Sequence, residues 1–211
     1  MTFEEALAAC GLVAILRGVQ PGEAVAIGEA LCTAGIRILE VPLNSHDPFA
    51  SIAALAKSAN GRFLVGAGTV LKAEQVDLLH AAGGTLSVSP DGNPEVIARA
   101  VTLGLMPLPG VFTPTEAFAA IRAGATYLKM FPAEAASPAV LKAWRAVLPG
   151  TVHVLPVGGI SADNMGTWLD AGAAGFGIGS SLFKPGDAPK DVAAKAVTLV
   201  AAWEKAKALA A

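Results

Sequence analysis

The stretch TPTEAFAAIRAGATYLKMF, residues 113–131, contains one complete helix-to-strand unit. Thr113 and Glu116 have the spacing of a helical capping box, and Pro114 stands at the first helical position, where a missing N–H is tolerated. Gly124 ends the alanine-rich amphipathic run, because glycine readily adopts the left-handed conformation that terminates a helix. The apolar run that begins at Thr126 then predicts a buried strand.

The same unit recurs along the whole chain. Cap-then-proline pairs also occur at 93–94 and 137–138, and Ala-Gly helix stops at 34–35, 82–83 and 171–172. Strand-like apolar runs begin near Leu12, Ile36, Phe63, Thr85, Leu105, Thr126, His153 and Ala174. Eight β–α units predict an α/β fold, a single (β/α)8 TIM barrel over residues 1–211.

Two further helices complete this prediction. Residues 2–9 form a short helix below the barrel, and residues 192–209 form the last outer helix. A doubly wound sheet is the alternative, but it would place a glycine-rich turn after the first strand. The chain has RGVQPGE there, and its glycine-rich turns come near the end.

Composition limits the classes of partner. The chain has 211 residues, of which 54% are hydrophobic and 15% charged, so we expect a globular protein with a large core. A net charge of -2 without a basic run argues against nucleic-acid binding. No apolar run approaches the roughly 18–20 residues of a membrane span, and the start, MTFEEALAAC, is acidic, so we predict a cytoplasmic protein without a membrane partner.

Cysteines and histidines give no sign of a metal site or a cofactor. Cys10 and Cys32 lie in helix-like segments and suit small apolar fillers in a reducing compartment, with a disulfide as the weaker interpretation. His46, His80 and His153 are scattered and lack the spacing of metal ligands. We therefore expect neither metal nor cofactor.

A single lysine interrupts the apolar strand from Thr126. Lys129 falls at a strand end, where barrels carry their reacting groups. Apolar neighbours would lower the pKa of its ammonium from about 10.4 towards neutrality, and a neutral amine adds to a carbonyl to form a Schiff base. The alternative is a lysine that extends to solvent.

Three other strand ends carry polar side chains. Glu40, in ILEVPLN, is predicted as a general acid/base, or alternatively as a structural carboxylate paired with Lys129 or Arg17. Arg17, in AILRG, suits a substrate carboxylate, unless it is only a solvated strand end. Thr69 offers a hydroxyl donor, or caps the helix that follows it.

Two glycine turns predict a phosphate site. VGGIS, residues 157–161, and GIGSS, residues 177–181, follow the seventh and eighth predicted strands, where many barrels bind phosphate through backbone N–H groups. The alternative is that these glycines only make tight turns.

Six motifs in order, AILRG, EVPLNS, GAGTVL, LKMFPAE, VGGIS and GIGSSLF, resemble the class I 2-keto-3-deoxy-6-phosphosugar acid aldolases, the KDPG and KDPGal aldolases, over nearly the whole chain. The resemblance implies a homotrimeric (β/α)8 barrel that releases pyruvate and glyceraldehyde 3-phosphate from a phosphorylated keto acid without a metal. It makes Lys129 the Schiff-base lysine and Glu40 the acid/base. It places Arg17 and Thr69 at the keto-acid end of the substrate, and Gly158, Gly159, Gly179 and Ser180 around the phosphate.

Two positions bear on the substrate epimer. Members that act on the gluconate epimer have an arginine four residues after the catalytic glutamate and a threonine before the glycine pair, where this chain has Asn44 and Val157. These residues imply 2-dehydro-3-deoxy-6-phosphogalactonate as substrate, although FPAE is closer to the gluconate branch. The alternatives are a gluconate-epimer or dual KDPG/KHG aldolase, and a phosphate-binding barrel without a Schiff base, either an isomerase or a binding protein.

Overall fold

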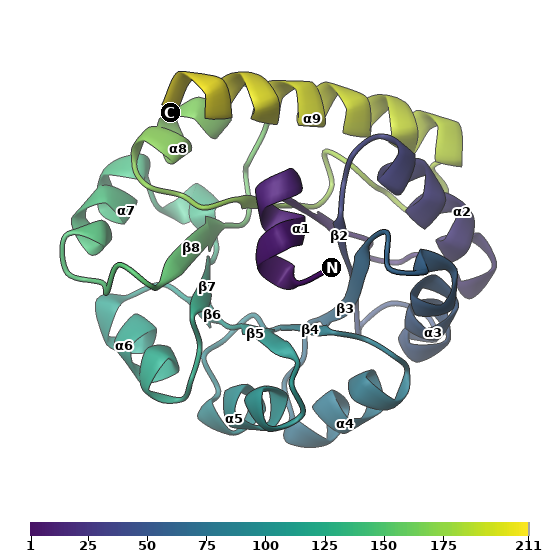
Figure 1. The fold of residues 1–211 in the computed structure, drawn as a ribbon, viewed down its shortest axis with the longest axis horizontal. Helices are drawn as coiled ribbons and strands as arrows, with labels where there is room; N and C mark the ends of the chain where they lie inside the picture. The colour runs from purple at the N-terminus through teal and green to yellow at the C-terminus, as the bar shows by residue number, and fades with distance from the viewer. Residues whose placement is uncertain (211) are drawn as a thin grey trace.

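Parallel strands alternate with helices along the chain, which is described here for residues 1–210 by a computed structural model (Figure 1). The strands are β1 (Leu12–Ile15), β2 (Ile38–Pro42), β3 (Leu64–Gly68), β4 (Leu86–Val88), β5 (Met106–Leu108), β6 (Gly110–Val111), β7 (Tyr127–Met130), β8 (His153–Pro156) and β9 (Phe176–Ile178). The helices are α1 (Phe3–Ala9), α2 (Pro21–Thr33), α3 (Pro48–Ala59), α4 (Ala73–Ala81), α5 (Pro94–Thr102), α6 (Pro114–Arg122), the 3-10 turn η1 (Ala133–Ala135), α7 (Pro138–Arg145), α8 (Met165–Asp170) and α9 (Pro189–Ala210). Each predicted strand start lies within two residues of an observed one, whereas α9 begins three residues earlier than predicted.

The strands form two curled parallel sheets. One sheet has six strands in the order β5-β4-β3-β2-β1-β9, and the other has three in the order β6-β7-β8. An isolated parallel bridge between Val157 and Gly177 connects the end of β8 to β9. Figure 1 shows the strands arranged in a ring, with the later helices outside them and α1 over the centre.

The fifth predicted strand is split in two at Pro109. β5 pairs with β4, and β6 pairs with β7. Pro109 has no N–H to donate to a ladder, although its carbonyl accepts the Lys129 N–H at 2.8 Å. The prediction of a single strand here was therefore wrong.

Most of the predicted helix boundaries are confirmed. Thr113 accepts from the Glu116 N–H in a complete capping box, and Asn93 accepts from the Glu95 N–H. Ser137 makes no capping hydrogen bond, so the expected side-chain cap of α7 was wrong. The predicted helix stops have positive φ angles, 109° at Gly35, 80° at Gly83, 110° at Gly124 and 95° at Gly172.

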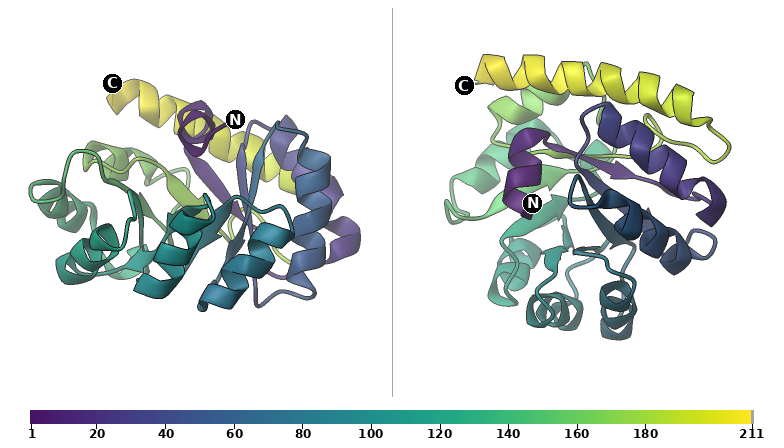
Figure 2. Two further views of the ribbon diagram at one scale, coloured as in Figure 1. Left: turned by 60° about the horizontal axis from the view of Figure 1, so that its bottom comes forward. Right: turned by 45° about the vertical axis from the view of Figure 1, so that its right-hand side comes forward.

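Apolar side chains fill two layers, one between the strands and the helices and one inside the space that the strands surround. The inner layer includes Val13, Ile38 and Leu155, and it is covered from one end by α1, which lies across the strands (Figures 1 and 2). The Phe3 ring of α1 meets the Tyr127 ring edge-on at 4.8 Å between centroids. The polar side chains described below lie towards the opposite end of the strands.

None of the helices described in residues 1–210 combines the length and apolar character that a bilayer crossing requires.

Candidate active site

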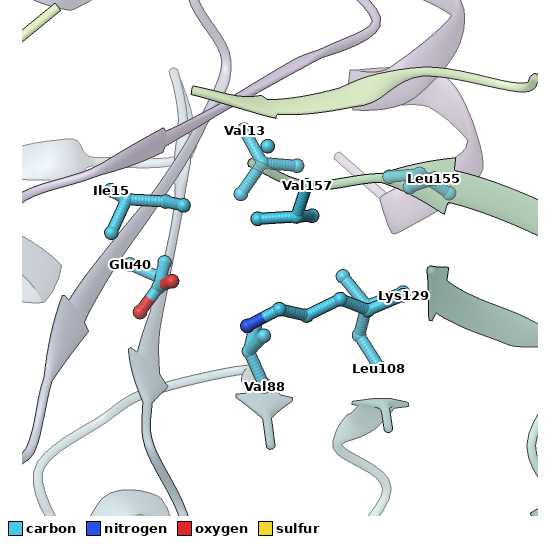
Figure 3. A pocket seen from close by; sticks show the side chains of 9 residues that line it. Val13, Ile15, Glu40, Val88, Leu108, Lys129, Leu155 and Val157 are labelled. Atoms are coloured by element: carbon cyan, nitrogen blue, oxygen red, sulfur yellow. The ribbon is translucent and has the colours of Figure 1, made fainter. Parts of the chain in front are cut away.

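Lys129 and Glu40 face each other inside the space that the strands surround. Side chains two residues apart on a strand share a face, so Lys129 follows Tyr127 and Glu40 follows Ile38 into the inner layer. Both are buried, with 6% of Lys129 and 2% of Glu40 exposed. Figure 3 shows the Lys129 amine and the Glu40 carboxylate directed towards one another from β7 and β2.

The cavity between these two groups is small and apolar. It measures about 10 Å³, enough for roughly one water molecule. Apart from Lys129 and Glu40, its lining consists of Val13, Ile15, Val88, Leu108, Leu155, Val157 and Gly177. A polar reaction centre is thus enclosed by hydrocarbon.

Burial shifts both groups towards their neutral forms. It raises the pKa of the Glu40 carboxyl to about 7, against the opposing effect of Lys129 and Arg17. It lowers the pKa of the Lys129 ammonium, which Glu40 opposes and Arg17 reinforces. Carbonyl addition requires an uncharged amine. Proton transfer near pH 7 is favoured by a carboxyl that titrates near neutrality.

The Glu40 carboxylate is not held in an ion pair. Within residues 1–210, no lysine or arginine nitrogen lies within 4.0 Å of it, and its Oε2 has no hydrogen-bond partner. The alternative of a structural salt bridge to Lys129 or Arg17 was therefore wrong. A buried, unpartnered carboxylate oxygen is costly to maintain and is typical of a functional group.

Gly68 provides the space in which Glu40 sits. A Cβ at position 68 would lie 1.6 Å from Glu40 Oε2 and 2.5 Å from its Cδ. The motif GAGT indicates a strand end, but the need for its second glycine arises from Glu40 on the neighbouring strand, β2. Gly68 is therefore a positioning residue that sequence reasoning missed.

Arg17 lies at the rim of the site, just beyond β1. Its Nη1 donates to Asn44 Oδ1 at 2.7 Å, which holds the guanidinium in place across 27 residues of sequence. Arg17 also lines a larger cleft together with Lys129. The structure thus places Arg17 and Lys129 around one cleft.

Thr69 follows β3 in an unusual backbone conformation. Its φ is 57°, in the left-handed region that β-branched residues rarely adopt and that is found preferentially at functional sites. The N-cap of α4 is Lys72, so the alternative of Thr69 as a helix cap was wrong. Thr69 is half-buried and lines neither the small cavity nor the larger cleft.

The larger cleft has a volume of about 610 Å³, within the range of small-molecule sites. Val157 borders both this cleft and the small cavity. The predicted phosphate residues that line the cleft are Gly158, Gly159, Gly179 and Ser180. The structure therefore joins the reacting lysine and both glycine turns in one continuous region.

The glycine turns are suited to an anion. Gly158 and Gly159 have φ angles of 107° and 68°, which glycine adopts without strain. Within residues 1–210, the N–H groups of Gly159 and Ser180 donate to no backbone carbonyl outside the strand ladders. Free N–H groups beside one hollow form an anion-binding surface.

Three further residues of the cleft were not predicted as site residues. The Phe131 ring lies under the Lys129 amine, with 4.5 Å between Nζ and the ring centroid. A Cβ on Gly158 would lie 1.8 Å from Glu134 Oε2, so an acidic group stands beside the glycine turn. Lys184 also lines the cleft. Phe131 and Glu134 belong to the same motif as Lys129, LKMFPAE, and this shared motif could have indicated them as site residues.

No metal centre is formed by the described part of the chain. Within residues 1–210, no three histidine, cysteine, aspartate or glutamate side chains converge as ligands would. The titratable groups that do converge, Lys129 and Glu40, are an amine and one carboxyl.

Comparison with known proteins identifies the family. A sequence profile described as KDPG and KHG aldolase matches residues 3–198. The chain belongs to the KDPG and KHG aldolase family. It is 48% identical over 193 residues to the probable 2-dehydro-3-deoxy-6-phosphogalactonate aldolase of Rhizobium meliloti (strain 1021), covering 92% of this chain and 91% of the relative.

A second relative and a solved structure are similarly close. The 2-dehydro-3-deoxy-6-phosphogalactonate aldolase of Escherichia coli (strain K12) is 46% identical over 195 residues, covering 92% of this chain and 95% of the relative. A solved structure described as native KDPGal superposes with a TM-score of 0.92 at 45% identity, covering 93% of this chain and 96% of the other. The resemblance noted in the six motifs thus extends over almost the entire aldolase chain.

Proposed function

We propose that this aldolase cleaves 2-dehydro-3-deoxy-6-phosphogalactonate to pyruvate and D-glyceraldehyde 3-phosphate through a Schiff base on Lys129. The observation that carries the proposal is the Lys129 amine facing the Glu40 carboxylate across an apolar cavity, with both pKa values shifted towards the neutral forms. The names of the relatives support the substrate.

The mechanism follows from these two groups. The neutral amine of Lys129 adds to the keto carbon, and Glu40 transfers the protons that convert the carbinolamine into an iminium with loss of water. The iminium then accepts the electron pair of the adjacent carbon–carbon bond. Glu40, acting through a water molecule, takes the proton from the hydroxyl whose carbon becomes the aldehyde. The enamine that remains is protonated and hydrolysed to pyruvate.

The two ends of the substrate bind on either side of Lys129. Arg17, oriented by Asn44, recognises the keto-acid carboxylate. The family resemblance assigns the Thr69 hydroxyl to the same end, although Thr69 lines neither the small cavity nor the larger cleft. The phosphate binds to the turns that contain Gly158, Gly159, Gly179 and Ser180. This remote binding energy orients the bond that is to be cleaved.

Val157 and Asn44 support the galactonate epimer. Val157 presents only methyl groups where a threonine hydroxyl would hydrogen-bond the substrate hydroxyl beside the scissile bond. Asn44 occupies the place of an arginine and instead accepts from Arg17. We therefore infer that the galactonate epimer has the larger kcat/KM.

We also infer that the whole chain is one domain and an eight-stranded barrel. The two sheets would join at Pro109, between β5 and β6, and at the Val157–Gly177 bridge, between the end of β8 and β9. The assembly is a homotrimer. The family resemblance supports this stoichiometry, and light scattering in solution would test it. Cytoplasmic residence remains a prediction from the sequence.

Trapping with borohydride tests the chemistry. Pyruvate plus borohydride should inactivate the enzyme irreversibly and add the mass of a reduced pyruvyl group at Lys129. Lys142, on the outer helix α7, is the matched internal control and should remain unlabelled. Labelling elsewhere, or none, would return the protein to the class of phosphate-binding barrels without a Schiff base.

A further inference from the structure

An aromatic ring lies close to the amine of Lys129. Lys129 Nζ lies 4.5 Å from the centroid of the Phe131 ring, well within the roughly 6 Å over which a ring face attracts a cation. The Phe131 ring is half-buried and lines the cleft that contains Lys129. Its backbone is fixed, because the Phe131 N–H donates to the Val111 carbonyl at 3.2 Å.

No other group of the described chain makes contact with a positive charge on this nitrogen. Within residues 1–210, Lys129 Nζ forms no salt bridge at 4.0 Å or less, and the nearby charge of Glu40 acts only at longer range. The remaining wall of the inner cavity is hydrocarbon. A cation formed here, on a side chain of which only 6% is exposed, therefore responds to the potential that the surrounding walls provide.

The proposed reaction forms such a cation and keeps it through the chemical step. Amine, ketone and one proton combine to give an iminium and one water: the carbon–nitrogen double bond forms, the carbon–oxygen bond breaks, and the nitrogen retains one positive charge. The charge disappears only when the electron pair of the cleaved carbon–carbon bond enters the enamine. Stabilising the cation therefore favours the species from which cleavage occurs.

We propose that the face of the Phe131 ring stabilises the cationic iminium on Lys129, which makes Phe131 a further catalytic residue of this site. The inference rests on the proposed Schiff-base function. The negative face of the ring quadrupole, at the observed separation and in a site largely shielded from water, acts on the charge that develops on the nitrogen. Neutral forms of the lysine receive no comparable stabilisation.

Fluorinated phenylalanines at position 131 separate this electrostatic role from packing. Successive fluorines withdraw charge from the ring face while leaving its size nearly unchanged. The readout is deuterium exchange into the pyruvate methyl group, which requires the iminium and the enamine but neither the phosphate nor the aldehyde half of the substrate. Phe131→Leu, measured in parallel, removes the ring altogether.

We expect the logarithm of the exchange rate at alkaline pH to fall steadily with fluorine number, reaching a loss on the order of 3- to 30-fold for the most fluorinated ring and for Leu. The alkaline limb of the pH profile, where the iminium loses its proton, should move to lower pH by about 0.5 to 1.5 units. The same series at Phe118, which packs against the outer layer of the core from helix α6, is the control and should change neither quantity.

The outcomes are distinguishable. A flat series at Phe131, with wild-type exchange intact, would overturn the inference and leave a ring that only packs. A wild type that neither exchanges pyruvate protons nor is labelled at Lys129 would instead refute the proposed function itself.

Discussion

Replacing Gly68 by alanine should impair Glu40 without unfolding the protein. The new Cβ would lie 1.6 Å from Glu40 Oε2, whereas real contacts of this kind are not shorter than 3.0 Å, so the oxygen must retreat by about 1.4 Å. The end of a glutamate side chain moves easily, and its displacement relieves the contact. Because a misplacement of about 1 Å can lower a rate 100-fold, we expect kcat/KM for cleavage to fall on the order of 100-fold.

Stability should change little in this variant. Gly68 does not have a positive φ, so alanine fits its backbone, and the lost freedom of the unfolded chain favours the variant by about 0.4–1 kcal/mol. For a domain of this size we expect Tm to stay within about 4 °C of the wild type. By contrast, Gly66→Ala places a Cβ 2.2 Å from the Leu86 carbonyl oxygen, a backbone atom, and should lower Tm markedly.

The assay is cleavage coupled to a dehydrogenase that consumes the released pyruvate, with Tm measured by circular dichroism. Gly150→Ala, where a Cβ meets open space, is the matched control and should be indistinguishable from wild type. Wild-type turnover in Gly68→Ala would contradict the role of Gly68 in positioning Glu40. The losses in kcat/KM of the two single variants should not multiply in the double variant Gly68→Ala/Glu40→Gln, because both changes should act through one carboxylate. Losses that do multiply would contradict the same role.

Three other substitutions test separate parts of the site. Glu40→Gln should lower turnover by about 100-fold or more while leaving inhibition by inorganic phosphate unchanged. The native state retains the Glu40 proton up to about pH 7, whereas the unfolded chain loses it near pH 4.5. The free energy of unfolding of the wild type should therefore fall as the pH rises from about 4.5 to 7. This contribution is absent in Glu40→Gln, so equal pH slopes of Tm for the two proteins would contradict it. Val157→Thr should shift kcat/KM several-fold towards the gluconate epimer, since one hydrogen bond contributes about 0.5–1.5 kcal/mol; a wild type that already prefers the gluconate compound would overturn the epimer assignment and leave the chemistry intact. Glu134→Gln should strengthen inhibition by inorganic phosphate several-fold, and less so at high salt, because it removes a negative charge beside Gly158; weaker inhibition would mean that Glu134 assists the anion.

The placement of Lys129 opposite Glu40 was predictable because local rules fix it. Lys129 and Glu40 are lone charges in apolar strands, and the period of two along a strand places each on the same face as an inner-layer residue. The rule that barrels carry reacting groups at strand ends then brings the two together. The helix stops were predictable for a similar reason, since the requirement for glycine lies in the backbone of a single residue.

Features that depend on a second segment were not predictable. Gly68 matters only because Glu40 projects from the adjacent strand, and Arg17 meets Asn44 across 27 residues. The place of Phe131 under the lysine depends on a side-chain orientation that no motif encodes. Pro109 splits one strand because its two neighbours belong to different ladders, which the sequence of that strand alone does not reveal.

The position of α1 has a consequence for the order of events in turnover. Because α1 and its Phe3–Tyr127 contact close one end of the inner space, the proposed Schiff base faces the cleft at the other end, which Lys129 lines. With its phosphate held by the glycine turns of that cleft, as proposed, the aldehyde fragment would lie between the enamine and solvent and should depart before pyruvate. Product release should therefore be ordered, with pyruvate leaving last, and in the direction of synthesis pyruvate should bind first and the aldehyde second.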